Sequence, residues 1–346
     1  MRNTREAALD PTPHSGSRGL LFLLMVILSV VALTAAACGG DDDDDDTGDG
    51  NGETPTEEPT ESGDNGDEEP TEPADDGNGD GNGGGGGTIE MGYVAGWPEG
   101  VASTFLWAHL LEEEGYTVET TPLDAGLLYE ALDTGDVHMY TDAWLPATHG
   151  QYMTDNINEL VTWYEQAGLY LTVPSYVDAT SLEDLSGMAD EFDSTITGIE
   201  PGAGMMATAR DSVMPAYGLE DWTLLESSTP AMLAELDSAI ANEEPIVVTL
   251  WSPGWWYNAY DLTNLEDPEG AWGDPEHISV VTTSGFAEDF PEVAGWLENF
   301  EMTDPQIAGL ISVGLNDNNE FDMSPENVEE WLSESENQEL VDSWLQ

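Results

Sequence analysis

The chain has 346 residues and is extremely acidic, with 72 Asp and Glu against four Lys and Arg and a formal net charge of −68. A surface of this sign repels nucleic acid and anionic lipid, so we exclude nucleic-acid binding and electrostatic adhesion to membranes. The many negative charges also repel one another within the protein. Salt screens this repulsion, with a Debye length of only about 3 Å near 1 M salt, and we therefore expect a high-salt habitat.

Residues 1–37 have the pattern of a secretory signal peptide. Arginines open the segment, and the apolar stretch "GLLFLLMVILSVVALTAAA" completes it. Small residues then precede Cys38, as in the bacterial lipobox, where a cysteine is lipidated and becomes the first mature residue. We expect a lipid anchor on Cys38 and a protein on the extracytoplasmic face of the plasma membrane. The alternative is an uncleaved transmembrane anchor.

Residues 38–87 begin with this cysteine and continue as an acidic stretch rich in Gly, Pro and Thr. The stretch has no large apolar residue, so it cannot bury enough surface to offset its loss of conformational entropy. We expect a disordered, self-repelling tether; weak calcium binding by the aspartate run 41–46 is the alternative. Because Cys38 is the only cysteine, no internal disulfide is possible and the folded domain depends on its core.

Residues 88–346 alternate strands with helices. The first half predicts, in chain order, a strand in "TIEMGYVAGW", a helix from about Ser103 to Gly115, a strand in "YTVETTP", a helix in "GLLYEALDTG" and a strand in "VHMYTDAWLP". The second half predicts the same order in "TITGIEPGAG", "MMATARDSVMPAYG", "WTLLESS", "PAMLAELDSAI" and "PIVVTLWSP". Both halves are therefore predicted to be β-α-β-α-β units.

The two units share a motif at the end of the third strand, where each runs into Trp-x-Pro. The interval along the chain from Trp97 to Trp144 equals that from Gly204 to Trp251. Alternating strands and helices favour an α/β fold with mainly parallel sheets flanked by helices. Ligands of such sheets bind beyond the carboxyl ends of the strands, so we predict a cleft lined with indole between two lobes.

Three of the twelve tryptophans are candidates for ligand binding. Trp97, Trp144 and Trp251 each lie at a strand end beside Gly or Pro. Indole faces bind cations, typically quaternary ammonium groups, with about 0.5–2 kcal/mol per contact; a sugar ring is the alternative guest. Trp255 and Trp256 either join this cage or pack beneath it; we favour packing, and the resemblance described below leaves their roles open. Tryptophans in helical or strand patterns are predicted to be core, namely Trp107, Trp163, Trp222, Trp296 and Trp331.

The glycine turn in "GIEPGAGMMA" indicates an anion site. Residues 202–207 match the dinucleotide fingerprint G-x-G-x-x-A, and Glu226 ends the next strand where a ribose ligand is expected, so a nicotinamide-dependent enzyme is one interpretation. We reject it because an exported protein does not meet that cofactor. The N–H groups that open the following helix still favour an anion, and a carboxylate serves as well as a phosphate.

His149 follows Trp144 closely and can donate a hydrogen bond to the same anion; an ordinary surface histidine is the alternative. A metal site of His138, Asp142 and His149 has no supporting ligand spacing, so we expect no metal. Neither a catalytic triad nor a carboxylate pair stands out from the general acidity, and we predict no enzyme activity and no cofactor. A cation cage facing an anion site predicts a receptor for a small zwitterion.

Several long segments make the chain resemble the substrate-binding proteins of glycine betaine/proline betaine ABC transporters. They are "GYVAGWPEGVAST", "TDAWLPATHGQY", "TVPSYV", "TGIEPGAGMM", "ESSTPAMLAELDSA", "PIVVTLWSPGWW", "YDLTNLEDP" and "GFAEDFPEVAGWL". The resemblance implies a two-lobed periplasmic-binding-protein fold with the ligand in the inter-lobe cleft. We expect residues 88–177 in lobe 1, 178–275 in lobe 2, and a return segment, 276–346, that completes lobe 1.

The resemblance also assigns site residues and partners. The indoles that cage the trimethylammonium group are matched by Trp97, Trp144 and Trp251. His149 matches the histidine that contacts the carboxylate, and Gly204 and Met205 match the pair whose backbone amides hold it. The implied ligand is glycine betaine or a related zwitterion, imported as an osmoprotectant. The implied partners are the permease and ATPase subunits of an ABC importer.

Two departures from the family pattern concern ligand preference. Gly254 stands where the family commonly has histidine, and Pro98 follows Trp97 in place of the usual acidic residue. The alternative function is therefore binding of choline, carnitine or a small sugar on the same fold. Choline lacks a carboxylate, so an acidic residue would be expected in place of the amides at Gly204 and Met205. A sugar would require polar side chains around the rings.

Overall fold

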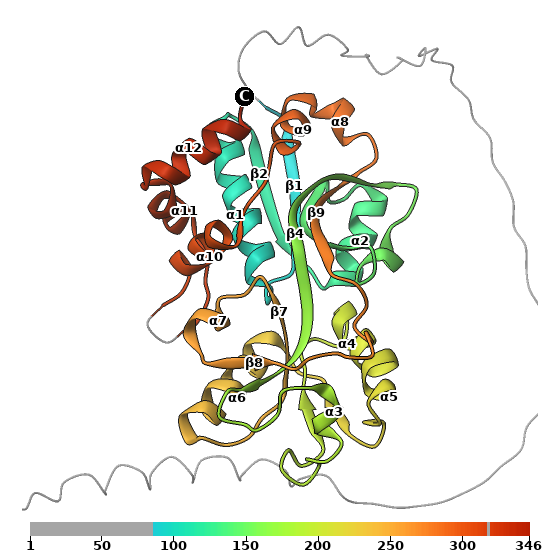
Figure 1. The fold of residues 1–346 in the computed structure, drawn as a ribbon. Helices are drawn as coiled ribbons and strands as arrows, with labels where there is room; N and C mark the ends of the chain where they lie inside the picture. The colour runs from blue at the N-terminus through green and yellow to red at the C-terminus, as the bar shows by residue number, and fades with distance from the viewer. Residues whose placement is uncertain (1–85, 317–318) are drawn as a thin grey trace, which may run out of the picture. The chain divides into compact units, whose positions relative to one another are not determined.

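The computed structural model describes residues 86–316 and 319–346, whose fold is drawn in Figure 1. They belong to one compact domain, residues 78–346. The predicted signal peptide (1–37) and Cys38 lie outside the described residues. Within the described ranges, no helix has both the length and the apolar character needed to cross a membrane.

The predicted tether, 38–87, also lies outside the described residues except for its last two glycines. The Gly86 N–H donates to the Gly115 carbonyl at 3.0 Å, and the Gly87 carbonyl accepts from the Thr117 N–H at 3.2 Å. The described backbone is thus bonded to the domain just before the first strand.

The first predicted β-α-β-α-β unit is confirmed. It comprises β1 (Thr88–Tyr93), α1 (Pro98–Glu113), β2 (Thr117–Pro122), α2 (Ala125–Thr134) and β3 (Met139–Leu145). One boundary was wrong, because α1 begins at Pro98 and not near Ser103. Proline suits the first helical position, where its fixed φ is already helical and no N–H is required. The Gly/Pro pattern predicted a loop here, whereas the helix begins directly after Trp97.

The second unit is also confirmed, with shorter strands. It comprises β5 (Thr195–Thr197), α4 (Gly204–Thr208), a π-helical turn (Ala209–Val213), α5 (Met214–Ala216), β6 (Thr223–Leu225), α6 (Thr229–Asn242) and β7 (Val248–Ser252). The predicted second-half helix is therefore a run of three segments, of which α4 is the first.

A single curled sheet joins the two units in the order β2-β1-β3-β9-β4-β7-β5-β6. Within each unit the strands are parallel, as predicted. The linking strands are antiparallel and were not predicted: β4 (Ile157–Pro174) pairs with β9 (Glu276–Thr283) in its first part and with β7 and β8 (Leu262–Asn264) in its last part. Figure 1 shows β4 running the length of the domain between the two groups of strands.

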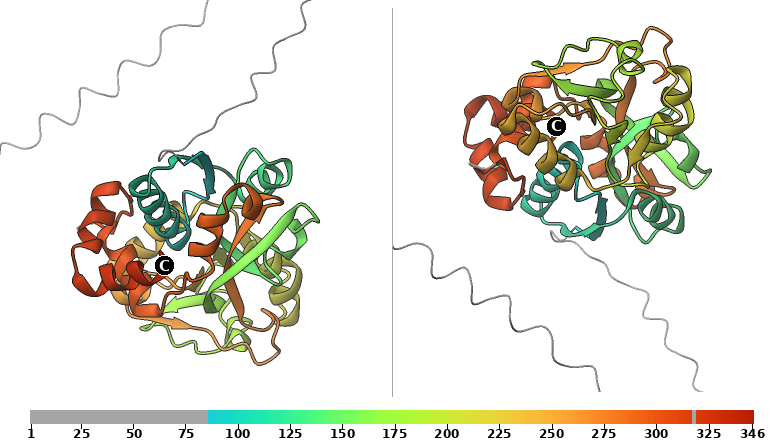
Figure 2. Two further views of the ribbon diagram at one scale, coloured as in Figure 1. Left: turned by 90° about the horizontal axis from the view of Figure 1, so that it is seen from above. Right: turned by 90° about the horizontal axis from the view of Figure 1, so that it is seen from below.

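Eight further helical segments complete the described fold. They are η1 (Gly150–Tyr152), α3 (Leu182–Leu185), α7 (Trp256–Ala259), α8 (Phe286–Asp289), α9 (Pro291–Leu297), α10 (Asp304–Val313), α11 (Pro325–Leu332) and α12 (Ser335–Trp344). Helices α10 and α11 pack on α1, and Figures 1 and 2 agree that α10–α12 lie together on that side. The five tryptophans predicted to be core are all buried.

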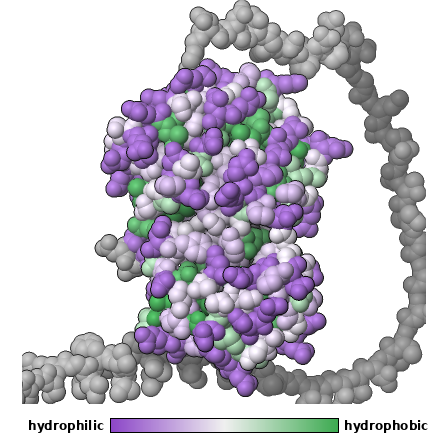
Figure 3. All heavy atoms as spheres, in the orientation of Figure 1, coloured by the Kyte–Doolittle hydropathy of each residue, from purple (hydrophilic) through white to green (hydrophobic). Residues whose placement is uncertain are grey.

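The outer surface reflects the composition. Figure 3 shows hydrophilic residues over most of the visible face, with apolar residues in small separate areas. Only three large hydrophobic side chains are exposed among the described residues, namely Leu127, Tyr176 and Leu225. Apolar surface is therefore concentrated inside, where it forms the core and the pocket described next.

Candidate ligand-binding site

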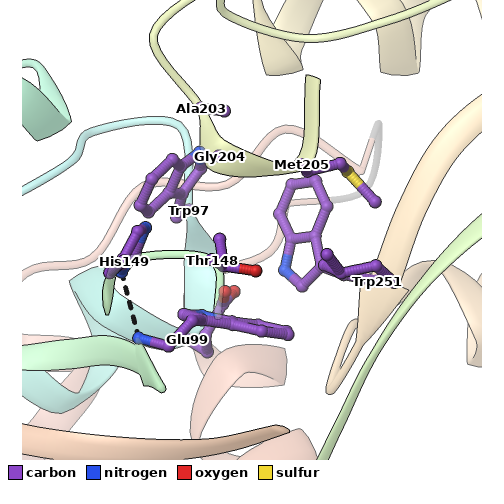
Figure 4. A pocket seen from close by; sticks show the side chains of 10 residues that line it. Trp97, Glu99, Thr148, His149, Ala203, Gly204, Met205 and Trp251 are labelled. Atoms are coloured by element: carbon purple, nitrogen blue, oxygen red, sulfur yellow. Dashed lines mark hydrogen bonds between the residues drawn. The ribbon is translucent and has the colours of Figure 1, made fainter. Parts of the chain in front are cut away.

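A small pocket lies where the two β-α-β-α-β units meet, with about 280 Å³ of space not occupied by protein atoms, part of it open to solvent. Ten residues line it: Trp97, Glu99, Trp144, Thr148, His149, Leu169, Ala203, Gly204, Met205 and Trp251. All six residues that the sequence analysis assigned to a ligand are in this set. The structure therefore brings both halves of the predicted site to one place (Figure 4).

The three tryptophans reach the pocket from the carboxyl ends of three strands. Trp97 follows β1 and caps α1, Trp144 is the next-to-last residue of β3, and Trp251 is the next-to-last residue of β7. Their side chains are only 6%, 4% and 3% exposed. Each Trp-x-Pro turn contains a cis proline, at Leu145–Pro146 and Ser252–Pro253. Three indoles from two units thus form an apolar wall shielded from solvent.

The indole N–H groups differ in their partners. Trp144 Nε1 donates to Asp142 Oδ1 at 2.9 Å. Nε1 of Trp97 is buried and has no hydrogen-bond partner among the described residues, whereas Nε1 of Trp251 is buried beside the Glu99 carboxyl. Trp144 is therefore the pocket indole whose Nε1 makes a well-defined hydrogen bond within the described residues.

His149 is buried behind Trp97 and is held in one tautomer. Its Nδ1 accepts the backbone N–H of Trp144 at 3.0 Å, so Nδ1 carries no proton and the neutral ring carries its proton on Nε2. Burial lowers the pKa of His149 to about 3, which keeps the ring neutral near pH 7. The ring stacks on Trp97 with centroids 5.5 Å apart. His149 can therefore donate one hydrogen bond from Nε2 without adding charge.

Gly204 and Met205 are the first two residues of α4, so their N–H groups have no carbonyl four residues earlier within the helix to bond. A Cβ built on Gly204 would lie 2.4 Å from the carbonyl oxygen of Thr148, which only glycine avoids. Figure 4 shows Ala203, Gly204 and Met205 on the side of the pocket opposite Glu99. This turn is therefore in direct contact with the loop that carries His149.

Glu99 is a pocket residue that the sequence analysis missed. Its side chain is 1% exposed, and Oε2 has no hydrogen-bond partner in the part of the chain that the structure describes. Burial raises the pKa of Glu99 to about 8, an effect partly opposed by its backbone and by the nearby Trp251 side chain. The signal was present: Glu99 follows the strand-end Trp97 by two residues, but the general acidity of the chain concealed it.

Asp142 lies behind this wall and forms a second buried carboxyl beside Glu99. Burial, and then the proximity of Glu99, raises the pKa of Asp142, while hydrogen bonds from Trp144 and Tyr140 oppose the rise. No lysine or arginine among the described residues lines the pocket. Arg210, the only basic residue after the signal peptide apart from histidines, pairs with Asp211 at 2.8 Å. The protein itself thus supplies no cation to neutralise these carboxyls.

Trp255 and Trp256 pack beneath the site, as expected, and do not line it. Trp256 is fully buried, donates its Nε1–H to the Trp251 carbonyl at 3.2 Å and meets the Trp251 ring edge-on with centroids 4.6 Å apart. A Cβ built on Gly254 would lie 2.1 Å from Trp256. The histidine common in the family therefore has no room at Gly254 with Trp256 in this position.

Two residues from the alternative readings lie elsewhere. His138 Nδ1 accepts the Glu90 N–H at 3.0 Å and does not line the pocket. Glu226 is exposed and is not a pocket residue either. The pocket is also too small for a dinucleotide, which leaves the nicotinamide reading without geometric support.

The chain is similar in sequence to proteins of known families. Residues 87–334 match the model of the family described as "Substrate binding domain of ABC-type glycine betaine transport system". The glycine betaine/carnitine transport binding protein GbuC of Listeria monocytogenes is 36% identical over 126 residues, which are 36% of this chain and 42% of that protein. The chain thus matches less than half the length of this relative.

Two solved structures match over nearly their whole length. Lactococcal OpuAC, in a closed form complexed with glycine betaine, is 32% identical with a TM-score of 0.66, over 75% of this chain and 99% of that one. The glycine betaine, L-proline-binding protein ProX of Borrelia burgdorferi is 28% identical with a TM-score of 0.68, over 75% and 97%. These matches confirm the two-lobed α/β fold. The chain belongs to the family of substrate-binding domains of ABC-type glycine betaine transport systems.

Proposed function

We propose that this protein binds glycine betaine, or a closely related zwitterion, and delivers it to an ABC importer. The observation that carries the proposal is the convergence of Trp97, Trp144 and Trp251 on one buried pocket together with His149 and the start of α4. The lactococcal relative, solved in complex with glycine betaine, and the Borrelia relative, named for glycine betaine and L-proline, support the same ligand class.

The three indoles suit the quaternary ammonium end of the ligand. Methyl groups on nitrogen cannot donate hydrogen bonds, so such a cation is held by dispersion and by attraction to aromatic faces. Each cation–π contact contributes about 0.5–2 kcal/mol, more where water is excluded. Side chains that are 3–6% exposed exclude water from the pocket. They also require the pocket to open for ligand entry, so binding involves a shift between conformations.

The carboxylate end of the ligand suits the opposite side of the pocket. Gly204 and Met205 offer N–H groups at the start of α4, where the helix dipole favours an anion. His149 offers a neutral Nε2–H donor, fixed in that tautomer by Trp144. The carboxylate is thus bound by dipoles and hydrogen bonds, without the lysine or arginine that this chain almost entirely lacks.

Choline is a second candidate because one observation favours it. Glu99 places a buried carboxyl group in the pocket, and a ligand with net positive charge would stabilise its ionised form. The sequence reading expected an acidic residue beside the amides of Gly204 and Met205 for choline, whereas Glu99 lies on the side opposite to them. Glycine betaine uses both sides of the pocket, and we therefore rank it first.

The transport role extends beyond the pocket. We infer a lipid anchor on Cys38, a tether from 38 to 87, and handover of the ligand to permease and ATPase subunits outside the cytoplasm. The acidic sequence supports a role in brine, where an imported compatible solute balances external salt. Lobes 88–177 and 178–275, completed by 276–346, would close around the ligand.

A calorimetric titration of the purified protein in molar salt tests the ligand. Glycine betaine, choline, carnitine and a neutral sugar are compared as separate titrants. We expect saturable binding of glycine betaine with the lowest Kd, and no binding of the sugar. Choline binding tighter than that of glycine betaine would make choline the ligand, and absence of heat with all four would refute the proposal.

A further inference from the structure

The loop after β3, residues 146–149, contributes Thr148 and His149 to the pocket. It also lies against the Gly204 turn, because a Cβ on Gly204 would lie 2.4 Å from the Thr148 carbonyl oxygen. Two hydrogen bonds join the end of this loop to β3. The Trp144 N–H donates to His149 Nδ1, and the His149 N–H donates back to the Trp144 carbonyl at 2.9 Å. These bonds fix the histidine ring relative to β3, but they leave Ala147 and Thr148 to be held from elsewhere.

Glu276 holds them. Its Oε2 accepts the backbone N–H of Ala147 at 3.0 Å and that of Thr148 at 2.9 Å. Its Oε1 accepts the Thr148 hydroxyl. Glu276 is the first residue of β9 and is 5% exposed. Three donors of one loop therefore converge on one buried carboxylate, which lies 128 positions away along the chain.

A carboxylate is the side chain that suits this position. It accepts at both oxygens and has no donor to oppose the three groups that point at it. Hydrogen bonds to an ionised acceptor are roughly twice as strong as neutral ones. Glutamine would keep one accepting oxygen but turn an NH₂ group toward a donor. Most acidic residues in the part of the chain that the structure describes face solvent, whereas these three hydrogen bonds of Glu276 all go to the 146–149 loop.

The position of Glu276 links the loop to the rigid part of the fold. In the sheet, Glu276 is paired with Ala167 of β4, and its neighbour His277 is paired with Leu145 of β3. The carboxylate is therefore anchored on the strands that join the two units. Moving it would move Thr148, whose carbonyl oxygen and Cγ2 would lie 2.4 Å and 2.7 Å from a Cβ on Gly204.

We propose that Glu276 is a positioning residue that sets the spacing between His149 and the N–H groups of Gly204 and Met205. It does not line the pocket and acts through the 146–149 loop. The inference rests on the proposed function, because this spacing matters for a ligand with a carboxylate. It predicts that Glu276 controls the affinity for glycine betaine much more than the affinity for a cation without a carboxylate.

The test compares Glu276→Gln with wild type and with Asp267→Asn. Asp267 is a matched control, since its carboxylate also accepts a backbone N–H, from Trp272 at 2.8 Å, and a hydroxyl, from Tyr217, but lies outside the pocket. We expect Glu276→Gln to raise the Kd for glycine betaine about tenfold, equivalent to about 1.4 kcal/mol, and that for choline less than twofold. Asp267→Asn should leave both within twofold.

A double-mutant cycle with His149→Ala supplies a second readout that does not depend on choline. If Glu276 acts through the loop, Glu276→Gln should cost much less in the His149→Ala background than in wild type. Equal costs in both backgrounds, or equal losses for glycine betaine and choline, would overturn the positioning role. So would an unchanged Kd in a folded Glu276→Gln protein.

Thr148→Val addresses the case in which Glu276→Gln fails to fold. It removes one of the three bonds to Glu276 and keeps the side-chain volume. We expect a Kd for glycine betaine about threefold higher, and an unchanged Kd would contradict the inference. If wild-type protein binds no glycine betaine, the proposed function fails and this inference with it; if wild type binds and the variants bind equally well, the inference alone fails.

Discussion

The two Trp-x-Pro turns share a sequence pattern, a strand end and a cis proline, yet they hold their indoles in different ways. Trp144 is fixed by polar contacts, with Nε1 bonded to Asp142 and its backbone N–H bonded to His149. Trp251 is held mainly against Trp256, which lies edge-on to its ring and donates its Nε1–H to the Trp251 backbone carbonyl at 3.2 Å.

This difference separates two kinds of sensitivity. An indole held by a hydrogen bond tolerates an isosteric substitution of its partner that keeps the acceptor atom. An indole held by packing tolerates a change of charge in its neighbours but not a change of their volume. We therefore expect the Trp251 turn to respond to steric substitutions and the Trp144 turn to respond to loss of an acceptor. The predictions below follow this division, from the largest effect to the smallest.

Trp251→Ala should have the largest effect on binding. The substitution removes one indole face and leaves space beside Trp256, so we expect the Kd for glycine betaine to rise tenfold or more, at least about 1.4 kcal/mol. Calorimetric titration measures the change, and Trp251→Phe, which keeps an aromatic face, should lose less. A Kd equal to that of wild type in a folded Trp251→Ala protein would remove Trp251 from the site.

Gly254→Ala should disturb the same turn through its packing. A Cβ at this position would lie 2.1 Å from Trp256, so Trp256 must shift and carry Trp251 with it. Overpacking of this kind costs about 1–3 kcal/mol of stability, and we expect a Kd about fivefold higher. Gly126→Ala is the control, because a Cβ there meets nothing within 4 Å. Equal thermal midpoints for the two variants would show that Trp256 does not constrain the turn.

Glu99 predicts a pH effect on stability without ligand. Burial raises its pKa from the usual 4.5 to about 8; the neighbouring Asp142 also has a raised pKa, and His149, in the same pocket, is neutral. Between these values the folded protein holds a proton that the unfolded chain has lost, so stability falls as pH rises from about 4.5 to 8.

Thermal unfolding of ligand-free protein across this range measures the effect. We expect a shallower decline in Glu99→Gln than in wild type, and no change in slope for Glu112→Gln, an exposed residue of the same helix. Saturating glycine betaine should also flatten the wild-type decline, because its ammonium group stabilises the ionised carboxyl. If the unfolding midpoints of wild type and Glu99→Gln change with pH in parallel, a raised pKa of the buried Glu99 would be contradicted.

Asp142→Asn should have the smallest effect. An asparagine Oδ1 can still accept the Trp144 Nε1–H, so the indole stays in place and we expect the Kd for glycine betaine to remain within twofold. Asp142→Leu removes the acceptor and should destabilise the protein by about 1–3 kcal/mol relative to Asp142→Asn, measured by denaturant unfolding. Equal stability of the two variants would mean that Trp144 is not held by this bond.

Much of the fold could be predicted from the sequence because each unit repeats a local pattern. The periodicity of strands and helices lies within short segments, so the parallel strands could be predicted. Because Trp-x-Pro marks equivalent strand ends, the positions of Trp144 and Trp251 could be predicted too. The antiparallel strands β4 and β9 did not, since their pairing joins segments far apart in the chain and β4 shows no regular alternation of buried residues.

The site divides in the same way. Trp97, Trp144, His149 and the Gly204 turn carry local signals of residue type and neighbours. Glu276 carries no such signal, and the position of Glu99 two residues after Trp97 is hidden by the general acidity of a chain with 72 acidic residues. Their roles depend on burial and on partners from distant segments, which only the folded structure supplies.

The most direct test of the central claim is a tryptophan-fluorescence titration of the purified protein in molar salt, with glycine betaine and choline side by side. The account predicts a saturable change in emission with glycine betaine at lower concentration than with choline, and loss of this preference in His149→Ala. Choline binding as tightly as glycine betaine would contradict the role of His149 and the Gly204 turn, and no change with either ligand would contradict the cation cage.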